Sequence, residues 1–195
     1  MAVRALADAA AETAVDPVIV RDVAATVGDL TARLAAATND DPFSDLRTDS
    51  VDYTVPSKLM PINPIIGDCN AGRPDVQVHY EGGEVRGRAL FSKRFTGPPG
   101  FVHGGITAML ADQIVAVTPG AAGLLRGGIT KSLAIRYRKP VPIREEIALW
   151  GVCTEDGDDL AAQFTISTDA GVAVEGTAVI VSAQRLFKGD PPTSR

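Results

Sequence analysis

Two titratable side chains stand by themselves in an uncharged stretch in the middle of the chain. Between Phe95 and Leu125 the only formally charged residue is Asp112 and the only other titratable residue is His103, although 22% of all residues are charged. The neighbours of Asp112 at three and four residues on either side are all apolar, so no Lys or Arg of this segment can pair with it. A lone carboxylate in apolar surroundings can become basic enough to activate water or attack a carbonyl carbon.

Asp112 also has a second interpretation. The carboxylate would then mark a solvent-exposed strip on a helix that is less buried than its composition indicates. Such strips normally carry several polar residues, and this segment carries one. The pattern therefore favours a catalytic carboxylate, with the exposed strip as the alternative.

His103, Gly104 and Gly105 begin the same segment. The start of a helix presents unpaired N–H groups and the positive end of the helix dipole, and glycine lets a ligand approach the backbone closely. Such a helix start can stabilise an oxyanion. The alternatives are glycines that only form a tight turn and a histidine that only caps the helix. Because His103 and Asp112 are nine residues apart, they are expected to bracket a substrate and not to form a dyad within one protomer.

The element that carries these residues is predicted to be a buried helix from Gly104 to Val117, because this stretch lacks proline and is apolar on nearly every face. Alternating patterns bounded by turn residues predict two strands before it and four after it. The six ranges are Val76 to Tyr80, Glu84 to Phe91, Ile129 to Arg138, Ile147 to Thr154, Leu160 to Thr168 and Val172 to Ala183. An antiparallel sheet of about six strands that curls around one long buried helix is the hot-dog fold, of the α+β class.

The front of the chain has a different pattern. Val23, Val27, Leu30 and Leu34 recur with helical spacing, which predicts a helix from about Asp22 to Ala36. A polar, turn-rich connection is expected from Thr38 to Thr54. The chain is therefore divided into an N-terminal helix and loop extension, residues 1–60, and a hot-dog domain, residues 61–195.

Composition excludes several classes of protein. Residues 1–60 hold five basic and ten acidic residues, which accounts for the whole net charge of −5, and an acidic extension argues against nucleic-acid binding. Two cysteines and two histidines supply too few ligands for a structural zinc cluster, so neither a metal nor a cofactor is expected. Charged residues near the start argue against a secretory signal, and no apolar stretch could span a membrane, so a cytoplasmic location is expected.

The segment from Phe101 to Asp112, FVHGGITAMLAD, closely resembles the HGG-to-Asp signature of the hot-dog acyl-CoA thioesterases of the phenylacetate-pathway (PaaI-like) group. The longer string FTGPPGFVHGG is similar to a branch that includes mitochondrial long-chain acyl-CoA thioesterases. With matching element order, the resemblance extends from about Val76 to Phe187, and it does not cover residues 1–60.

The resemblance implies roles for particular residues. Asp112 would be the general base or the nucleophile, the Gly104 N–H would polarise the thioester carbonyl, and His103 would hold the loop or the substrate, beside Gly105. Thr130 falls where the family has a Ser or Thr that positions the attacking water, although by its sequence context it is an ordinary β-branched strand residue. Many relatives also carry an Asn or Gln several residues before the His, where this chain has Thr96-Gly97-Pro98-Pro99.

The resemblance also implies partners. The substrate would be an acyl-CoA, with each active site between two protomers of a homodimer or homotetramer. Arg136, Arg138 and Lys139 are candidates to contact the CoA phosphates, with solvated strand ends as the alternative. The three aromatic residues Phe164, Trp150 and Tyr137 are interpreted as core residues.

The same residues argue against other functions of the fold. A hot-dog hydratase would need a histidine soon after the aspartate, and the residues from Gln113 to Thr118 contain none. An acyl-CoA-binding regulator would need a basic DNA-binding element, which the acidic extension does not supply. An inactive acyl-CoA-binding module is disfavoured because the HGG motif and Asp112 are both present.

Overall fold

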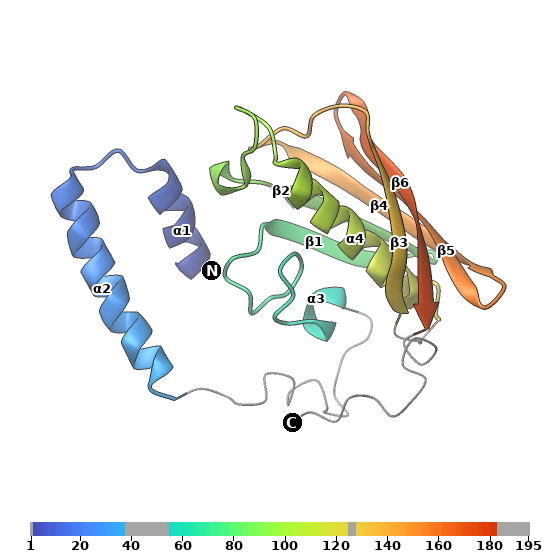
Figure 1. Cartoon of the computed structure of the whole chain (residues 1–195), viewed down its shortest axis with the longest axis horizontal. Coiled ribbons are helices and arrows are strands. Elements are labelled where there is room, and N and C mark those ends of the chain that lie inside the picture. Colours follow the sequence, from blue (N-terminus) through green and yellow to red (C-terminus); the bar gives the residue numbers. More distant parts are fainter. Residues whose placement is uncertain (1, 38–54, 125–127, 183–195) are drawn as a thin grey trace.

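The protein is built around one antiparallel sheet. The computed structural model describes residues 2–37, 55–124 and 128–182, so the expected connection from Thr38 to Thr54 lies outside the described residues. Six strands are arranged in the order β1-β2-β4-β5-β6-β3 (Figure 1). The strands are β1 (Asp75–Glu81), β2 (Glu84–Leu90), β3 (Gly128–Tyr137), β4 (Glu146–Asp156), β5 (Asp159–Thr168) and β6 (Gly171–Ser182). All six were predicted to within two residues at either end, and the hot-dog fold is confirmed.

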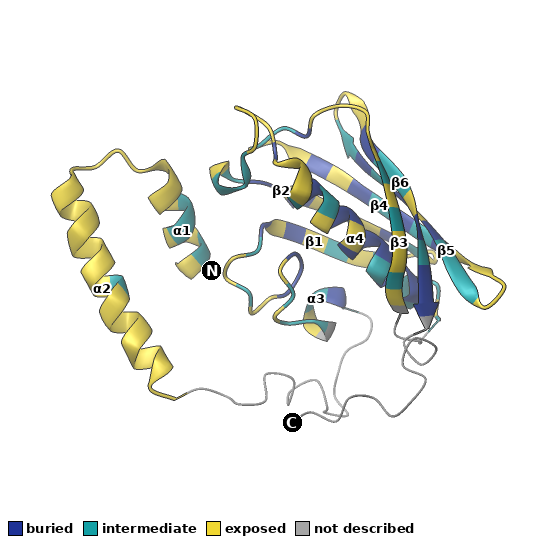
Figure 2. Cartoon of the chain, in the orientation of Figure 1, coloured by how far each residue is buried: buried dark blue, intermediate teal, exposed yellow. Residues whose placement is uncertain are grey.

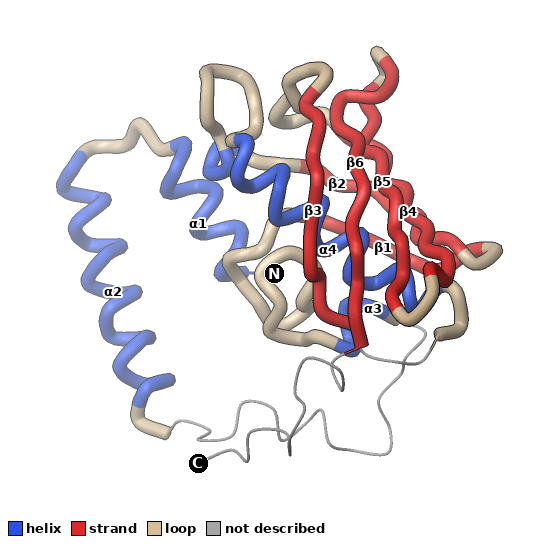
Figure 3. The backbone as a smooth tube through the Cα atoms, turned by 45° about the vertical axis from the view of Figure 1, so that its right-hand side comes forward, coloured by secondary structure: helices blue, strands red, loops and turns tan. Residues whose placement is uncertain are grey.

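Helix α4 (Gly104–Ala121) connects β2 to the far edge strand β3 and packs against one face of the curled sheet (Figures 1 and 3). Its side chains Leu110, Ile114 and Val115 are at most 1% exposed. Gly151 on β4 allows a close approach, because a β-carbon there would lie 2.6 Å from the Ile114 Cγ2 atom. Burying each such large apolar side chain contributes about 1.5–3 kcal/mol, so this layer is the core of the domain.

The prediction that this helix is buried on every side was wrong. Gly105, Met109 and Asp112 are exposed, with Met109 at 42%, and they recur at the spacing of a single helix face. Figure 2 shows exposed and buried residues side by side along α4. A helix that lies on one sheet face can bury only the side turned toward the sheet, whatever its composition. We call Gly105, Met109 and Asp112 the outer strip of α4.

The N-terminal extension contains two helices, α1 (Ala2–Glu12) and α2 (Pro17–Ala35). Helix α2 begins five residues earlier than its apolar spacing predicted, and α1 was not predicted. Asp16 caps α2 by accepting a hydrogen bond from Val18 N at 2.7 Å, and Pro17 takes the first helical position. Neither helix buries a residue, so the apolar stripe of α2 faces outward (Figure 2). None of the helices in the described ranges is long and apolar enough to cross a membrane.

The segment between the short helix α3 (Pro56–Leu59) and β1 is fastened to α4 by Asn63. The Asn63 side chain donates to Gln113 Oε1 at 2.6 Å, and its own Oδ1 accepts from the N–H groups of Ile65 and Ile66 at 2.8 and 3.1 Å. Ile65 and Ile66 are at most 2% exposed. A pair of amide side chains therefore anchors this segment over the helix.

Replacing Asn63 is expected to destabilise the domain. Asn63→Ala leaves the buried Gln113 carbonyl oxygen without a donor, and an unpaired buried polar group costs about 1–3 kcal/mol. Chemical denaturation should show a lower unfolding free energy, with partial recovery in the Asn63→Ala/Gln113→Leu double variant. Asn70→Ala, which removes hydrogen bonds of the exposed loop, is the control and should cost less. Equal stability of the Asn63 and Asn70 variants would contradict this role.

Candidate functional site

A tight loop from Thr96 to Val102 carries the chain into α4. Thr96 and Val102 form a β-bridge, and the loop turns through Gly100, whose φ of +86° favours glycine. The turn returns His103 to the end of the 3-10 helix η2 (Lys93–Phe95), where the His103 N–H donates to Phe95 O at 2.8 Å. The backbones pass so closely that a β-carbon on Gly97 would lie 2.8 Å from His103 Cα. The place of His103 is thus determined by backbone contacts on two sides.

His103 is the N-cap of α4. Its Nδ1 accepts a hydrogen bond from Gly105 N at 3.0 Å, and an accepting Nδ1 belongs to a neutral imidazole with its proton on Nε2. The Gly105 N–H is therefore occupied within the chain. The Gly104 N–H, in contrast, donates to no other described residue, and a β-carbon on Gly104 would meet nothing within 4 Å. A free N–H at the positive end of an 18-residue helix, open to approach, is a suitable donor to an oxyanion.

Asp112 lies on the outer strip of α4 and makes no hydrogen bond or ion pair with the described residues. Asp112 is exposed, so the described residues do not enclose its carboxylate in the expected apolar cleft. Asp112 is the only charged residue of the outer strip, and the other two members, Gly105 and Met109, are uncharged. Gly104 and Asp112 share the helix but are eight residues apart, or about 12 Å along its axis.

Thr130 makes no side-chain hydrogen bond with Asp112 or any other described residue. Tyr137, at the end of β3, donates its hydroxyl to Gly104 O at 3.0 Å, so this end of the strand meets the beginning of α4. Thr130 is near the other end of β3, about 23 Å from Tyr137 along the strand at ~3.3 Å per residue. The strand is irregular there, because the pairing with β6 shifts between Thr130 and Ser132. Such bulges often re-aim side chains near functional sites.

The basic residues at the end of β3 differ in their partners. Arg138 is paired with Glu175, whose hydrogen bond lowers the pKa of the Glu175 carboxyl and raises that of Arg138. Lys139 donates to Ala170 O at 2.6 Å. The exposed Arg136 side chain makes no hydrogen bond or ion pair within the described part of the chain. The charge of Arg136 helps to lower the pKa of the Glu175 carboxyl, but its guanidinium has no hydrogen bond in this part of the chain and is the most available of the three to a ligand.

Tyr137 is a residue of the helix start that its sequence context did not indicate. It was interpreted as a core aromatic, but it is 53% exposed and its hydroxyl reaches the helix start. Phe164, with 1% exposure, is in the core as predicted, and Trp150 is partly buried. The contact between Tyr137 and Gly104 joins residues 33 positions apart, so no local pattern could have indicated it.

The described residues contain two free thiols, an exposed Cys69 and a buried Cys153. Burial raises the pKa of the Cys153 thiol, although a hydrogen bond with Thr118 opposes that shift. Among the residues that the structure describes, no group of three or more His, Cys, Asp or Glu side chains is arranged to hold a metal ion. The chemistry available at this site is that of one carboxylate, one imidazole and backbone donors.

No family model matches this chain. A solved thioesterase superfamily protein superimposes with a TM-score of 0.78 and 27% sequence identity, covering 93% of this chain and 87% of that one. A hypothetical thioesterase from Streptococcus pneumoniae TIGR4, solved with coenzyme A, gives 0.51 and 20%, with 56% of this chain and 86% of that one covered. A protein from Streptococcus mutans UA159 bound to acetyl-CoA gives 0.51 and 20%, with 56% and 89% covered.

The first of these neighbours also matches the extension. Coverage of 93% of 195 residues leaves about 14 unmatched, fewer than the 19 residues of α2. The two streptococcal proteins match about half of this chain but most of their own length. The chain therefore has the hot-dog fold, extended at its N-terminus, and the solved structures that it resembles include a thioesterase-superfamily protein.

Proposed function

We propose that the protein is an acyl-CoA thioesterase, which hydrolyses an acyl-CoA to the free acid and CoA. The observation that carries this proposal is the unpartnered Gly104 N–H, open to approach at the start of α4, on the same helix as the exposed Asp112. The coenzyme A and acetyl-CoA bound to two proteins of the same fold support the substrate class. The proposal includes the subgroup: we place the protein in the PaaI-like group of hot-dog thioesterases, near the branch of mitochondrial long-chain acyl-CoA thioesterases.

The Gly104 N–H donates to the thioester carbonyl and stabilises the negative charge that develops on its oxygen. With Asp112 as general base, the carboxylate takes a proton from water, the hydroxide attacks the carbonyl carbon, and the C–S bond breaks. The proton then passes to the CoA thiolate. With Asp112 as nucleophile, the carboxylate itself attacks the carbonyl carbon, the C–S bond breaks, and CoA leaves as its thiolate. Water then hydrolyses the mixed anhydride, which releases the acid, restores the Asp112 carboxylate and supplies the proton for the thiolate. His103 holds the helix start in place, and Gly105 keeps the space next to its imidazole clear.

A second copy of the chain completes the site in this proposal. The ~12 Å between Gly104 and Asp112 along one helix is long for two groups that act on one carbonyl and one water. Two copies of α4 that face each other antiparallel through their outer strips would bring Gly104 of one copy to Asp112 of the other, twice per dimer. The same contact would cover the exposed Met109 and remove water from around the carboxylate. Arg136, whose side chain makes no hydrogen bond with another described residue, would meet the CoA phosphates.

Gly104→Pro is expected to reduce turnover of acyl-CoA by about 100-fold or more, because it removes the N–H that stabilises the oxyanion. Proline is well accepted at the first position of a helix. His103 already has the extended backbone, φ −60° and ψ 134°, that the residue before proline requires. Circular dichroism should show an intact fold. Gly104→Ala is the matched control, since it keeps the N–H, and it should remain active. Wild-type turnover by Gly104→Pro would exclude this donor.

Asp112→Asn is expected to abolish turnover while leaving the fold intact. A heterodimer of two different variants then tests whether each site is shared between two protomers. One protomer carries Asp112→Asn, the other carries Gly104→Pro, and two affinity tags select the heterodimer. If each site takes Gly104 from one protomer and Asp112 from the other, one of the two sites is intact, and activity returns to about half of wild type. Sites built within single chains would leave the heterodimer inactive. Wild-type activity of Asp112→Asn itself would remove the carboxylate from the mechanism.

Thr130 is tested by two substitutions. If its hydroxyl orients the attacking water, Thr130→Val should lower kcat by roughly 10- to 100-fold with little change in KM, whereas Thr130→Ser should keep most of the activity. Steady-state kinetics with one long-chain acyl-CoA decide this, with thermal stability as the control for the strand. Equal kcat for wild type and Thr130→Val would leave Thr130 as a structural residue.

A hydrolysis panel of short, long, branched and aromatic acyl-CoAs tests the function itself and defines its specificity. Hydrolysis should persist in the presence of a chelator, because the proposed groups are a carboxylate and backbone donors. A wild-type protein that binds these esters but hydrolyses none of them would instead be an acyl-CoA-binding module.

A further inference from the structure

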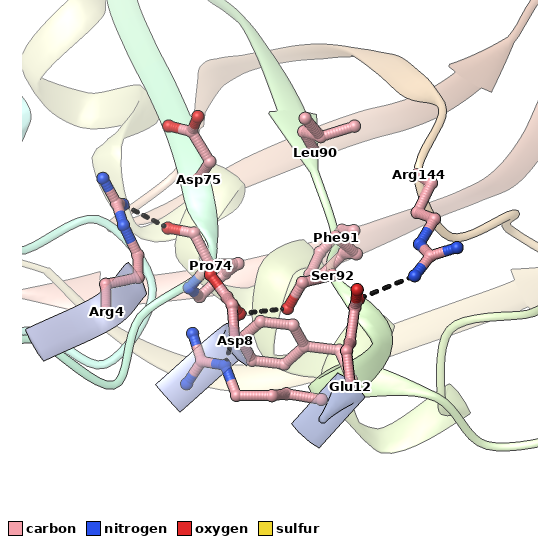
Figure 4. Close-up of a pocket in the computed structure, with 11 residues that line it drawn as sticks. Arg4, Asp8, Glu12, Pro74, Asp75, Leu90, Phe91, Ser92 and Arg144 are labelled. Atoms are coloured by element: carbon pink, nitrogen blue, oxygen red, sulfur yellow. Dashed lines mark hydrogen bonds and ion pairs between the residues drawn. The ribbon is translucent and has the colours of Figure 1, made fainter. Parts of the chain in front are cut away.

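Helix α1 is attached to the hot-dog domain by polar contacts. It buries no residue, and a cavity of about 270 Å³ lies between it and the adjoining end of the sheet (Figure 4). Asp8 Oδ1 accepts hydrogen bonds from Ser92 Oγ and from Arg94 Nε, both at 2.6 Å. Glu12 forms an ion pair with Arg144 at 2.8 Å, and Arg4 donates to Pro74 O at 3.4 Å. These contacts, and not apolar packing, determine where α1 lies.

The Asp8 contact is more enclosed than the Glu12 contact. The Arg94 side chain is 17% exposed, compared with 61% for Arg144. Partial burial acts to raise the pKa of Asp8, but the hydrogen bonds from Ser92 and Arg94 and the positive charges of Arg94 and Arg4 together lower it below 3.8. Asp8 is therefore ionised at neutral pH, and the contact with Arg94 is a charge-assisted hydrogen bond.

Both partners of Asp8 belong to the segment that holds His103. Ser92 caps η2, since its carbonyl accepts from Phe95 N at 3.1 Å, and the Arg94 guanidinium lies 4.9 Å from the centre of the Phe95 ring. Phe95 O in turn accepts the His103 N–H at 2.8 Å. A continuous series of contacts thus leads from Asp8 through η2 to the N-cap of α4.

We propose that Asp8 is a positioning residue for the thioesterase site: through Ser92 and Arg94 it holds η2, and η2 holds His103 and the Gly104 N–H in their places. This inference rests on the proposed function and gives the N-terminal extension a part in it. Solved hot-dog proteins that match only about half of this chain show that the fold itself forms without such an extension. The extension therefore has a role other than completing the core.

Glu12 provides a matched control. Like Asp8, it is a carboxylate of α1 that pairs with an arginine of the domain. Its partner Arg144 lies just before β4, outside η2, and the pair is exposed, so it is expected to contribute little. Asp8→Ala and Glu12→Ala thus remove the same chemical group from the same helix, but only the first loosens η2.

The experiment uses the full-length chain with four substitutions: Asp8→Ala, Asp8→Asn, Arg94→Ala and Glu12→Ala. Asp8→Ala should lower kcat by about 10-fold with less than about a 2-fold change in KM, because a small displacement of positioned groups slows chemistry more than binding. Asp8→Asn keeps an acceptor oxygen and should fall between Asp8→Ala and wild type. Arg94→Ala should lower kcat as much as Asp8→Ala does. The Asp8→Ala/Arg94→Ala double variant should be no slower than either single variant, because both remove the same contact. Glu12→Ala should stay within about 2-fold of wild type.

Hydrogen exchange of the His103 amide provides a second measurement that does not depend on activity. Its hydrogen bond to Phe95 O should be protected in wild type and Glu12→Ala, and less protected in Asp8→Ala. Unchanged kcat and unchanged His103 exchange in Asp8→Ala would overturn the inference, as would an equal loss of kcat in Glu12→Ala. If wild type hydrolysed no acyl-CoA, the proposed function would fail, and exchange at His103 would still decide whether Asp8 positions it.

Discussion

The packing of α4 on the sheet is the constraint on which the rest of the structure depends. Leu110, Ile114 and Val115 each contribute about 1.5–3 kcal/mol by burial, and an uncompensated buried carboxylate would cost several kcal/mol. The gain from burying the apolar side chains and the cost of burying Asp112 both favour the same rotation of the helix about its axis. The apolar side chains therefore face the sheet, and Asp112 lies on the outer strip. The position of the carboxylate thus follows from the core that lies beneath it.

The start of the helix is governed by the backbone. His103 uses its side chain for Gly105 and its own N–H for Phe95 O, which leaves Gly104 as the residue with a free donor. Helix termini must find partners for such groups, and here the partner can come from outside the chain. The open donor and the lone carboxylate lie about 12 Å apart along the helix, which is why our proposal places each hydrolytic site between two chains. In that proposal a symmetric dimer holds two sites, each with Gly104 of one copy and Asp112 of the other.

The extension differs from the domain in the forces that hold it. Hydrophobic burial holds the sheet and α4 together, whereas α1 buries no residue and is held by hydrogen bonds and ion pairs. Polar contacts of this kind are individually weak but directional. They suit an element that orients a neighbouring loop more than one that stabilises a core. In our proposal, α1 therefore acts on the site through these directional contacts and not by completing the core.

The sequence by itself determined the strands, the central helix and the motif. Alternation with a period of two and turn residues depend on neighbours along the chain, so all six strands could be located, and the isolation of His103 and Asp112 was visible as composition. The tertiary structure decided which face of α4 is covered, because that helix is apolar on most sides and its pattern did not select one. It also decided the contacts of Asp8 with Arg94, Asn63 with Gln113 and Tyr137 with Gly104, which join residues 86, 50 and 33 positions apart. Pairings at such separations arise only when the packed sheet and helix bring distant segments together, so no local pattern records them.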